Sequence, residues 1–475
     1  MESIYLHSLN PNPNPNPLSR STSGPWRSRF APNLRSSNRL LRIRRPRSLA
    51  PPLALQRRSS DHDVVVVGAG IVGLAIARHL LLHCGLSVAV ADAGVPCSGA
   101  TGAGQGYVWM AHKTLGSDAW QLAVRSKQLW EEMADGVARE GLDPQHILGW
   151  KKTGSLLIGR SAEELTTLEE RVKVFTEAGL RAEYLSSSSL SSMEPALEVG
   201  KEGGAAFLPD DCQLDAHQTV SFIEKRNKSF APEGRYAEFY NDPAIGLLRS
   251  DRSGAIEAVQ TSEKILYGKK AIVIAAGAWS GSLMRSFDVN APDVPVKPRK
   301  GHLLVLENFN EIKLNHGLME AGYIDHQVGT SSDSATADSE QTLLSISMTA
   351  TIDAKGNLVL GSSRQFSGFC REVDESIIKR IWDRAGEFFP TLRTISLDSL
   401  RKRQIRIGHR PYMPDGKPVI GPVPGLPNIL LATGHEGSGL SLISQALGTA
   451  EMVADMILGN SPVVDCTPFS IRGRF

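Results

Sequence analysis

The sequence has few cysteines and no apolar run long enough for a membrane, and both shortages exclude classes of protein. The five cysteines are scattered, odd in number and never in C-x-x-C spacing, so neither a disulfide framework nor a metal site is indicated. The apolar stretch 64–77 is interrupted by three glycines and runs into Arg78 and His79. It is too short to cross a bilayer, so we expect a buried segment and no transmembrane helix.

Lysine is absent from the first 60 residues, where acids are almost absent too. This leader carries eleven Arg and one acidic residue, Glu2, whereas the whole chain has 52 basic and 50 acidic residues. The net charge of +2 therefore comes from the leader, and the rest of the chain is net acidic. A nucleic-acid partner is not expected for such a body.

The leader is rich in Ser, Pro and Arg, a composition shared by organelle transit peptides. We interpret residues 1–60 as a disordered transit peptide. The alternative is a disordered basic tail that carries no targeting signal. The Ser- and Pro-rich start favours the chloroplast. The cluster "RLLRIRRPR" at 39–47 suits the mitochondrion equally well.

A glycine motif follows the leader. Four valines at 64–67 predict a strand buried on both faces, and Gly68-x-Gly70-x-x-Gly73 leads into a helix-like pattern. In a dinucleotide fold the first glycine permits the tight turn and the second lets the backbone approach a pyrophosphate. The third lets the helix pack closely on the strand. The helix N-terminus then points its free N–H groups at the phosphates.

A second strand, 87–92, ends at Asp92, nineteen residues after Gly73. A carboxylate at this place accepts hydrogen bonds from a ribose hydroxyl and disfavours a 2′-phosphate. Strand, glycines, helix, strand and acid in order therefore predict FAD or NAD rather than NADP.

The stretch "CSGATGAGQGYVW" at 97–109 is loop-like and rich in glycine where a nicotinamide domain would proceed to a third strand. It suits a second close approach to an extended cofactor, or it is a plain linker. Its candidate contacts are Ala100, Thr101, Gly104 and Gly106. A further buried strand at 271–276 ends at Gly277, which leaves space near the cofactor.

The chain resembles the D-amino-acid oxidase-type flavoproteins, which include glycine oxidase, sarcosine oxidase and bacterial D-amino acid dehydrogenase. The resemblance is carried by "VVVVGAGIVGLAIARHL", "SGATGAGQG", "FLPDDCQLDAHQTV", "VIAAGAWS", "PVKPRKGHLLVL", "GNLVLGSS" and "GHRPYMPDGKPVIGPVPGLPNILLATGHEGSGLSLISQALGTA", in the order of the family. It implies an α/β fold with a Rossmann-like FAD-binding domain, whose parallel sheet is built from discontinuous segments. A substrate domain with a mostly antiparallel sheet would cover the flavin.

We expect the FAD-binding domain at 61–115, 205–290 and 400–465, and the substrate domain at 140–204 and 291–399. The polar stretch 329–342 is interpreted as a flexible insertion, either a lid or a tolerated loop.

The glycine turn near residue 437 precedes a helix whose positive end would stabilise a reduced flavin. The resemblance assigns this role to Gly437, Ser438 and Gly439. His435 beside them either touches substrate or flavin, or is a hydrogen-bonded structural histidine.

Arg410 in "GHRP" matches the arginine that holds the substrate carboxylate in this family. A planar guanidinium can hold a carboxylate by two parallel hydrogen bonds. The alternatives are an arginine paired with Asp415 or another acid as turn scaffolding, and Arg406 as the clamp.

Two departures from sarcosine oxidase-type relatives matter. Tyr412 and Met413 stand where those relatives carry a flavin-bonded cysteine, so FAD should be non-covalent. Val359 replaces the lysine that helps to activate oxygen, which leaves oxygen, a quinone or another carrier as the electron acceptor.

The sequence thus predicts an FAD-dependent enzyme that oxidises the C–N bond of a small amino or imino acid through its carboxylate. One alternative is a flavin-containing assembly or chaperone-like factor without turnover. The other is an NADPH-dependent flavin monooxygenase.

Overall fold

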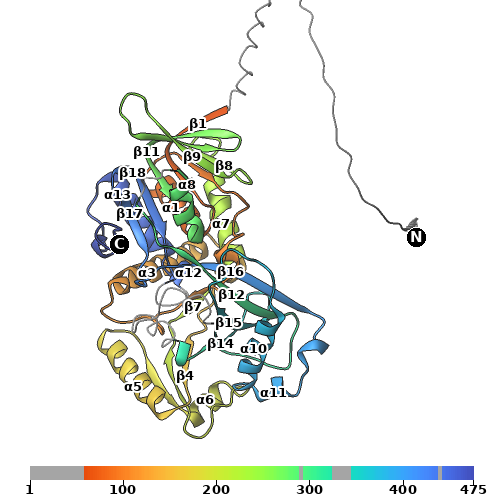
Figure 1. Cartoon of the computed structure of the whole chain (residues 1–475). Coiled ribbons are helices and arrows are strands. Elements are labelled where there is room, and N and C mark those ends of the chain that lie inside the picture. Colours follow the sequence, from red (N-terminus) through yellow and green to blue (C-terminus); the bar gives the residue numbers. More distant parts are fainter. Residues whose placement is uncertain (1–57, 288–291, 324–343, 437–440) are drawn as a thin grey trace, which may run out of the picture. The chain divides into compact units, whose positions relative to one another are not determined.

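The computed structural model describes residues 58–287, 292–323, 344–436 and 441–475. Its first sheet is mainly parallel and lies in the upper part of Figure 1. The strand order is β17 (Val419–Val423), β18 (Leu426–Thr433), β11 (Lys264–Ile274), β1 (Arg58–Val67), β2 (Val88–Ala91) and β8 (Tyr236–Phe239). The antiparallel strands β9 (Ala244–Arg249) and β10 (Ile256–Thr261) extend β11. Three stretches of chain far apart in sequence thus build one sheet, and the discontinuous Rossmann-like domain is confirmed.

The valine run of β1 is buried on both faces of this sheet, as its composition predicts. Val64 and Val66 pack into one core cluster, whereas Val65 and Val67 pack into another on the opposite face. Alternate side chains of a strand point to opposite faces, so an all-apolar run requires cover on both sides.

Helices cover one face of the first sheet. The cluster that holds Val64 and Val66 also contains apolar residues of six α-helices: α1 (Ile71–His83), α3 (Asp118–Arg139), α4 (Pro144–Leu148), α7 (Ala216–Lys228), α12 (Ser441–Ser444) and α13 (Ala446–Leu458). On the other face, α8 (Ser280–Phe287) contributes Met284 to the second cluster.

The second sheet has eight strands and is antiparallel except for the pair β13–β4. Its order is β16 (Arg403–Tyr412), β12 (Lys297–Leu306), β15 (Leu358–Arg364), β14 (Ser345–Ile352), β13 (Gly317–Glu320), β4 (Ser155–Gly159), β6 (Gly204–Leu208) and β5 (Glu183–Ser186). The helices α6 (Ser187–Met193), α10 (Glu375–Gly386) and α11 (Pro390–Arg393) contribute to the core on one of its faces. The mostly antiparallel substrate domain is therefore confirmed.

Two segments expected in the first domain lie in the second sheet. Strand β16 pairs along its whole length with β12, from Lys297 opposite Tyr412 to Leu306 opposite Arg403. Strand β6 pairs with β4 and β5. The boundaries at 205 and 400 therefore shift to about 209 and 413, because a domain ends where hydrogen-bonded pairing ends and composition does not mark that point. The insertion 329–342 and the leader up to residue 57 lie outside the described residues.

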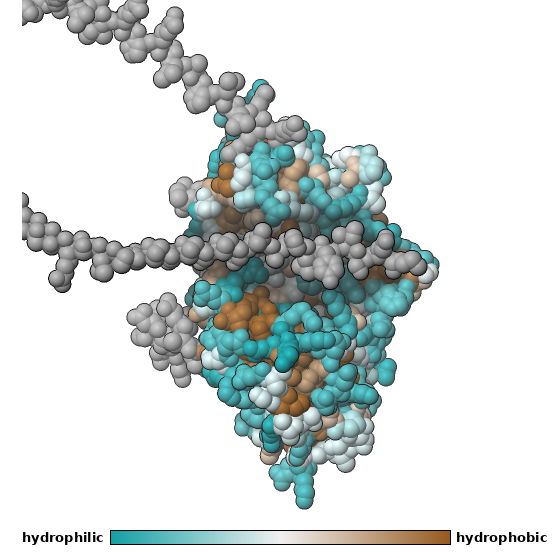
Figure 2. Space-filling model, turned by 90° about the vertical axis from the view of Figure 1, so that its right-hand side faces the viewer, coloured by the Kyte–Doolittle hydropathy of each residue, from teal (hydrophilic) through white to brown (hydrophobic). Residues whose placement is uncertain are grey.

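Polar side chains cover most of the face shown in Figure 2, with the apolar ones gathered in a few patches. Within the described residues, none of the helices is long and apolar enough to cross a membrane.

Candidate active site

The turn between β1 and α1 needs glycine at two positions for steric reasons. Gly68 has φ +118°, and a Cβ there would lie 2.7 Å from the backbone carbon of Ala275 at the end of β11. A Cβ on Gly73 would lie 3.1 Å from the backbone carbon of Gly68 and 3.2 Å from a methyl group of Val66. These two glycines let β1, α1 and the end of β11 approach one another.

Gly70 serves the other side of the same turn. It is the N-cap residue of α1 and has no side chain with which to cap this helix. It also lines the large cavity described below. The N–H groups at a helix start and the positive end of the helix dipole favour an anion at this place.

Asp92 follows β2 and is fixed beside this turn. Its carboxylate accepts hydrogen bonds from the backbone N–H of Ala69 at 2.6 Å and of Gly94 at 2.7 Å. Thr101 supports the same turn, since its hydroxyl accepts a hydrogen bond from the N–H of Ile71 at 3.2 Å. The glycine-rich stretch 97–109 is therefore a packed part of the site, with a short helix α2 (Ala100–Ala103) and strand β3 (Tyr107–Val108), rather than a linker.

A cavity of about 470 Å³ extends from Asp92 to His435. Ligand pockets for cofactors and drug-sized molecules commonly measure about 300–1,000 Å³. Segments from both sheets line it, and its walls include Gly68, Gly70, Asp92, Ala100, Thr101, Gly277, His409, Pro411 and His435. The cavity therefore brings together most of the cofactor residues that the sequence predicts.

A smaller cavity of about 60 Å³ shares Ala100, Pro411, His435 and Leu442 with the large one. Its other walls are Gly104, Gln105, Gly106, Tyr107, Arg410, Glu436 and Ile443. Gly106 is needed for packing as well, because it has φ +79° and a Cβ there would lie 2.9 Å from the backbone carbon of Leu214. The carboxylate clamp proposed from the sequence thus lies next to the cofactor cavity.

The side chain of Arg410, on β16, extends across the neighbouring strand β12 to β15. Arg410 stands opposite Arg299 in the ladder of β16 with β12, and its Nη1 donates to the carbonyl of Ser363 at 3.0 Å. A Cβ on Gly301 would lie 2.6 Å from its Cζ, so the guanidinium passes over this glycine. Burial lowers the pKa of Arg410, the charges of Arg364 and Arg299 lower it further, and Tyr323 and Glu436 oppose the shift.

Asp415 and Arg406 form other ion pairs, whereas a different acid, Glu436, lies 3.9 Å from Nε of Arg410. Asp415 pairs with Arg474 at 2.8 Å and not with Arg410. Arg406 forms an ion pair with Asp353 at 3.1 Å.

Glu436 and Arg299 belong to this site, and the sequence analysis missed both. Their side chains are 2% and 9% exposed, and Nε of Arg299 donates to Oε1 of Glu436 at 2.8 Å. The same oxygen lies 3.9 Å from Nε of Arg410. One signal in the sequence could have indicated them. Burying the acid of "GHEGSG" or the arginine of a mainly apolar strand costs free energy unless each charge is paired.

His435 is buried, and it lines both cavities. Its Nε2 is hydrogen-bonded to the hydroxyl of Thr449 at 2.9 Å. Burial lowers its pKa to about 3, and the charge of Lys113 contributes, so the ring is neutral near pH 7. Gly437, Ser438 and Gly439 lie outside the described residues.

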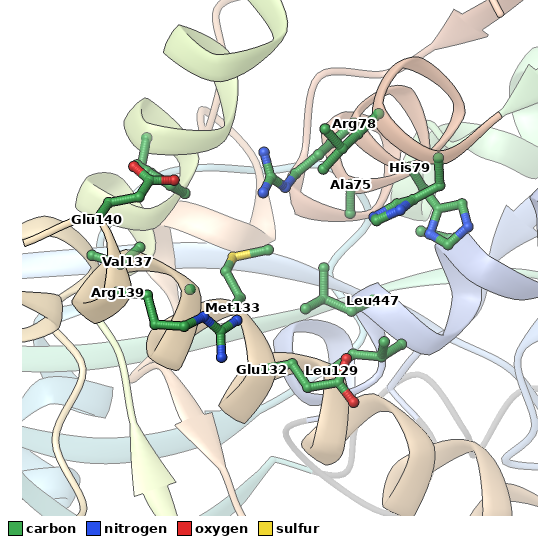
Figure 3. A pocket seen from close by; sticks show the side chains of 15 residues that line it. Ala75, Arg78, His79, Leu129, Glu132, Met133, Val137, Arg139, Glu140 and Leu447 are labelled. Carbon is green, nitrogen blue, oxygen red and sulfur yellow. The ribbon is translucent and has the colours of Figure 1, made fainter. Parts of the chain in front are cut away.

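A separate hollow of about 290 Å³ lies among α1, α3, α7 and α13 (Figure 3). Arg78 and His79 of α1, Glu132 and Arg139 of α3 and Leu447 of α13 line it. Ile71 and His79 are about 12 Å apart along α1, at a rise of 1.5 Å per residue. Ala75, which also lines the hollow, is about 6 Å from Ile71. The hollow shares no lining residue with the cofactor cavity.

Comparison with known proteins places the chain in a family. The family model described as FAD dependent oxidoreductase matches residues 63–456. The chain belongs to this family. Because the turn at Gly70, the fixed Asp92 and the cavity fit a dinucleotide, the geometry agrees with the family's cofactor, and FAD is the cofactor of this chain.

Relatives within the family share most of the chain at low identity. Glycine oxidase of Pseudomonas aeruginosa is 27% identical over 418 residues, which cover 86% of this chain and 99% of that protein. D-amino acid dehydrogenase of Vibrio atlanticus is 24% identical over 331 residues, 68% of each chain. The crystal structure of glycine oxidase from Geobacillus kaustophilus superposes with a TM-score of 0.71 at 22% identity, covering 88% of this chain and all of that one. These likenesses support an oxidoreductase and leave its substrate to be determined.

Proposed function

We propose that this protein oxidises the C–N bond of a small amino or imino acid whose carboxylate is held by Arg410. One observation carries the proposal: a largely buried guanidinium lines a small cavity that shares four residues with the cofactor cavity. Two parallel N–H···O bonds from one planar group would orient the α-carbon relative to the cofactor.

The reaction would remove one hydrogen from carbon and one from nitrogen, and a C=N bond would form. When bound, FAD would accept the C–H hydrogen together with its two electrons, and the hydrogen on nitrogen would leave to water as a proton. The amine must enter this step neutral, so its extra proton leaves to water beforehand. Water then adds to the released imine to give a keto acid and ammonia, or the corresponding amine.

The electron acceptor in this proposal is a quinone or another carrier rather than oxygen. The support is Val359, which stands in the place of an oxygen-activating lysine and is buried against Leu303 and Val305. Production of hydrogen peroxide at the rate of substrate oxidation would contradict this part of the proposal.

Anaerobic bleaching of the flavin in the purified holoenzyme tests the reaction. Glycine, sarcosine, cyclic imino acids and both enantiomers of common amino acids would be screened. We expect bleaching by at least one carboxylate-bearing amine. A flavin that no amine bleaches would favour an assembly role without turnover, and rapid bleaching by NADPH would favour a monooxygenase.

Replacement of the clamp tests the role of Arg410. Arg410→Ala should retain FAD and lower kcat/KM for amino acids about 100-fold or more, because charge-assisted hydrogen bonds to the carboxylate are lost. Arg406→Ala is the matched control on the same strand and should stay within about threefold of the wild type. Equal losses in both variants would disprove the clamp.

We also propose that residues 1–60 direct the protein to the chloroplast, with the mitochondrion as the alternative. The support is the Arg-, Ser- and Pro-rich, acid-poor composition. Microscopy of this leader fused to a fluorescent protein in plant cells would test it, and diffuse fluorescence would contradict it.

A further inference from the structure

The substrate side of the site carries more positive charge than one carboxylate requires. Arg299, Arg364 and Arg410 come from the three adjacent strands β12, β15 and β16, and we call them the arginine cluster. Within the described part of the chain, Glu436 is the one carboxylate in ion-pair contact with the cluster, through Arg299 at 2.8 Å and Arg410 at 3.9 Å. Three guanidinium groups and one carboxylate leave two uncompensated positive charges.

Arg364 is the member of the cluster without a hydrogen-bond partner. The residue is 4% exposed, and its Nη1 and Nη2 atoms are buried with no partner among the described residues. Its Cζ stands 3.8 Å from the ring centroid of Tyr323. This cation–π contact stabilises the charge but leaves the in-plane N–H donors unused. A buried guanidinium with unused donors costs free energy, and a bound anion would remove that cost.

Arg364 lies close to the carboxylate clamp. In addition to burial, the charge of Arg364 lowers the pKa of Arg410, and Tyr323, whose ring Arg364 covers, also acts on that pKa. The strands that carry the two arginines flank β12 on either side. Adjacent strands lie about 4.8 Å apart, so long side chains on the two flanking strands can converge on one small ligand. Arg410, in turn, lines the small cavity.

We propose that Arg364 binds a second carboxylate, so that the preferred substrate is a short dicarboxylic amine of the size of aspartate, glutamate or iminodiacetate. This inference rests on the proposed function, in which Arg410 holds the first carboxylate. A dicarboxylic amine with its nitrogen neutral carries two negative charges, which balance the two uncompensated positive charges of the cluster. A monocarboxylic amine such as glycine leaves one of them buried and unpaired.

Single-turnover reduction of the flavin in the holoenzyme tests the proposal. Wild type and Arg364→Met would be mixed anaerobically with glycine, alanine, aspartate, glutamate and iminodiacetate, each chiral amino acid as both enantiomers. We expect a dicarboxylate to reduce the wild-type flavin with the highest efficiency. Arg364→Met should lose about 10- to 100-fold in efficiency with that dicarboxylate, while monocarboxylates change by less than about threefold. Arg406→Met, whose native side chain is paired with Asp353, should behave like the wild type.

Binding of a non-oxidisable dicarboxylate provides a readout that does not depend on turnover. Malonate and succinate would be titrated into the holoenzyme while the flavin absorbance is followed, with acetate as the monocarboxylate probe. Wild type should bind a dicarboxylate at least about 10-fold more tightly than acetate, and Arg364→Met should abolish this difference. Arg364→Lys, which keeps the charge without the forked geometry, should retain part of it.

The outcomes separate the two proposals. If glycine reduces the flavin as efficiently as every dicarboxylate, the second carboxylate site is refuted and the Arg410 clamp stands. An equal loss for all amines in Arg364→Met assigns this residue a structural role and overturns the inference. If none of the amines reduces the flavin but dicarboxylates bind through Arg364, the anion site stands and the proposed reaction fails.

Discussion

The glycine turn before α1 and the arginine cluster on the second sheet serve one site but are built in different ways. The turn is local: Gly68, Gly70 and Gly73 lie within six residues, and Asp92 follows at the end of the next strand. The cluster comes from β12, β15 and β16, with its carboxylate from the turn after β18. In the turn, missing side chains let backbone approach a ligand. In the cluster, buried guanidinium groups provide positive charge for an anionic ligand.

The difference shows what each region contributes. A turn that offers backbone N–H groups recognises the phosphates that every dinucleotide carries, so it fixes the cofactor and little else. A set of guanidinium groups recognises the number and spacing of carboxylates, so it can select a substrate. Variants that damage one region and spare the other test this division.

Gly68→Val should have the largest effect. Its Cβ would meet the backbone of Ala275, and φ +118° is unfavourable for a β-branched residue. We expect no FAD-loaded protein in the soluble fraction, measured by absorbance near 450 nm against protein concentration.

Gly85→Ala is the control for this variant. Gly85 also has positive φ, +66°, but no atom lies within 4 Å of an added Cβ. Its cost should be about 1 kcal/mol, with FAD retained. Normal FAD content in Gly68→Val would refute the steric account of the turn.

The next effect lies within the arginine cluster. Arg299→Met leaves Glu436 buried without its closest partner, so the free energy of unfolding should fall by about 3–5 kcal/mol. Arg364→Met removes a buried charge that has no hydrogen-bond partner among the described residues, and should change the free energy of unfolding by less than about 1 kcal/mol. Urea unfolding of both holoenzymes in excess FAD measures the contrast. Equal destabilisation would mean that Arg364 is structural.

The same contrast explains which parts of the fold and of the site could be predicted from the sequence. The sequence predicts the β1 valines, the three glycines and Asp92 correctly, because one strand–turn–helix–strand unit sets their spacing. Arg410 was found through family resemblance, and its neighbours were not. Arg299, Arg364 and Glu436 are separated by tens of residues, and only strand pairing brings them together. The domain boundary at β16 was misplaced for the same reason, because a hydrogen-bonded ladder has no signature in composition.

A smaller effect is expected at His435, through pH. The folded-state pKa of about 3 lies below the ordinary value of 6.5, because the ring is buried near Lys113. Between these values the unfolded chain binds a proton that the folded chain does not, so stability is lost as the pH falls below 6.5. From pH 6.5 to pH 5 this amounts to about 2 kcal/mol, at about 1.4 kcal/mol per pH unit.

His435→Gln should therefore lose less stability than the wild type over this interval, in urea unfolding at a series of pH values. His146, whose side chain is 85% exposed, provides the control, and His146→Gln should follow the wild-type curve. Parallel curves for all three proteins would show that His435 is not buried as a neutral ring.

Removal of residues 1–56 should have the smallest effect on the folded enzyme. The first described strand begins at Arg58 and the family match begins at residue 63, so we expect the glycine turn and the arginine cluster to form without the leader. The truncated protein should match the full chain in FAD content and in kcat/KM within about twofold, whereas its isoelectric point should become acidic because most of the excess basic charge is gone. A large loss of FAD on truncation would mean that the leader contributes to the fold, and the division between a cofactor turn and a substrate cluster would then be incomplete.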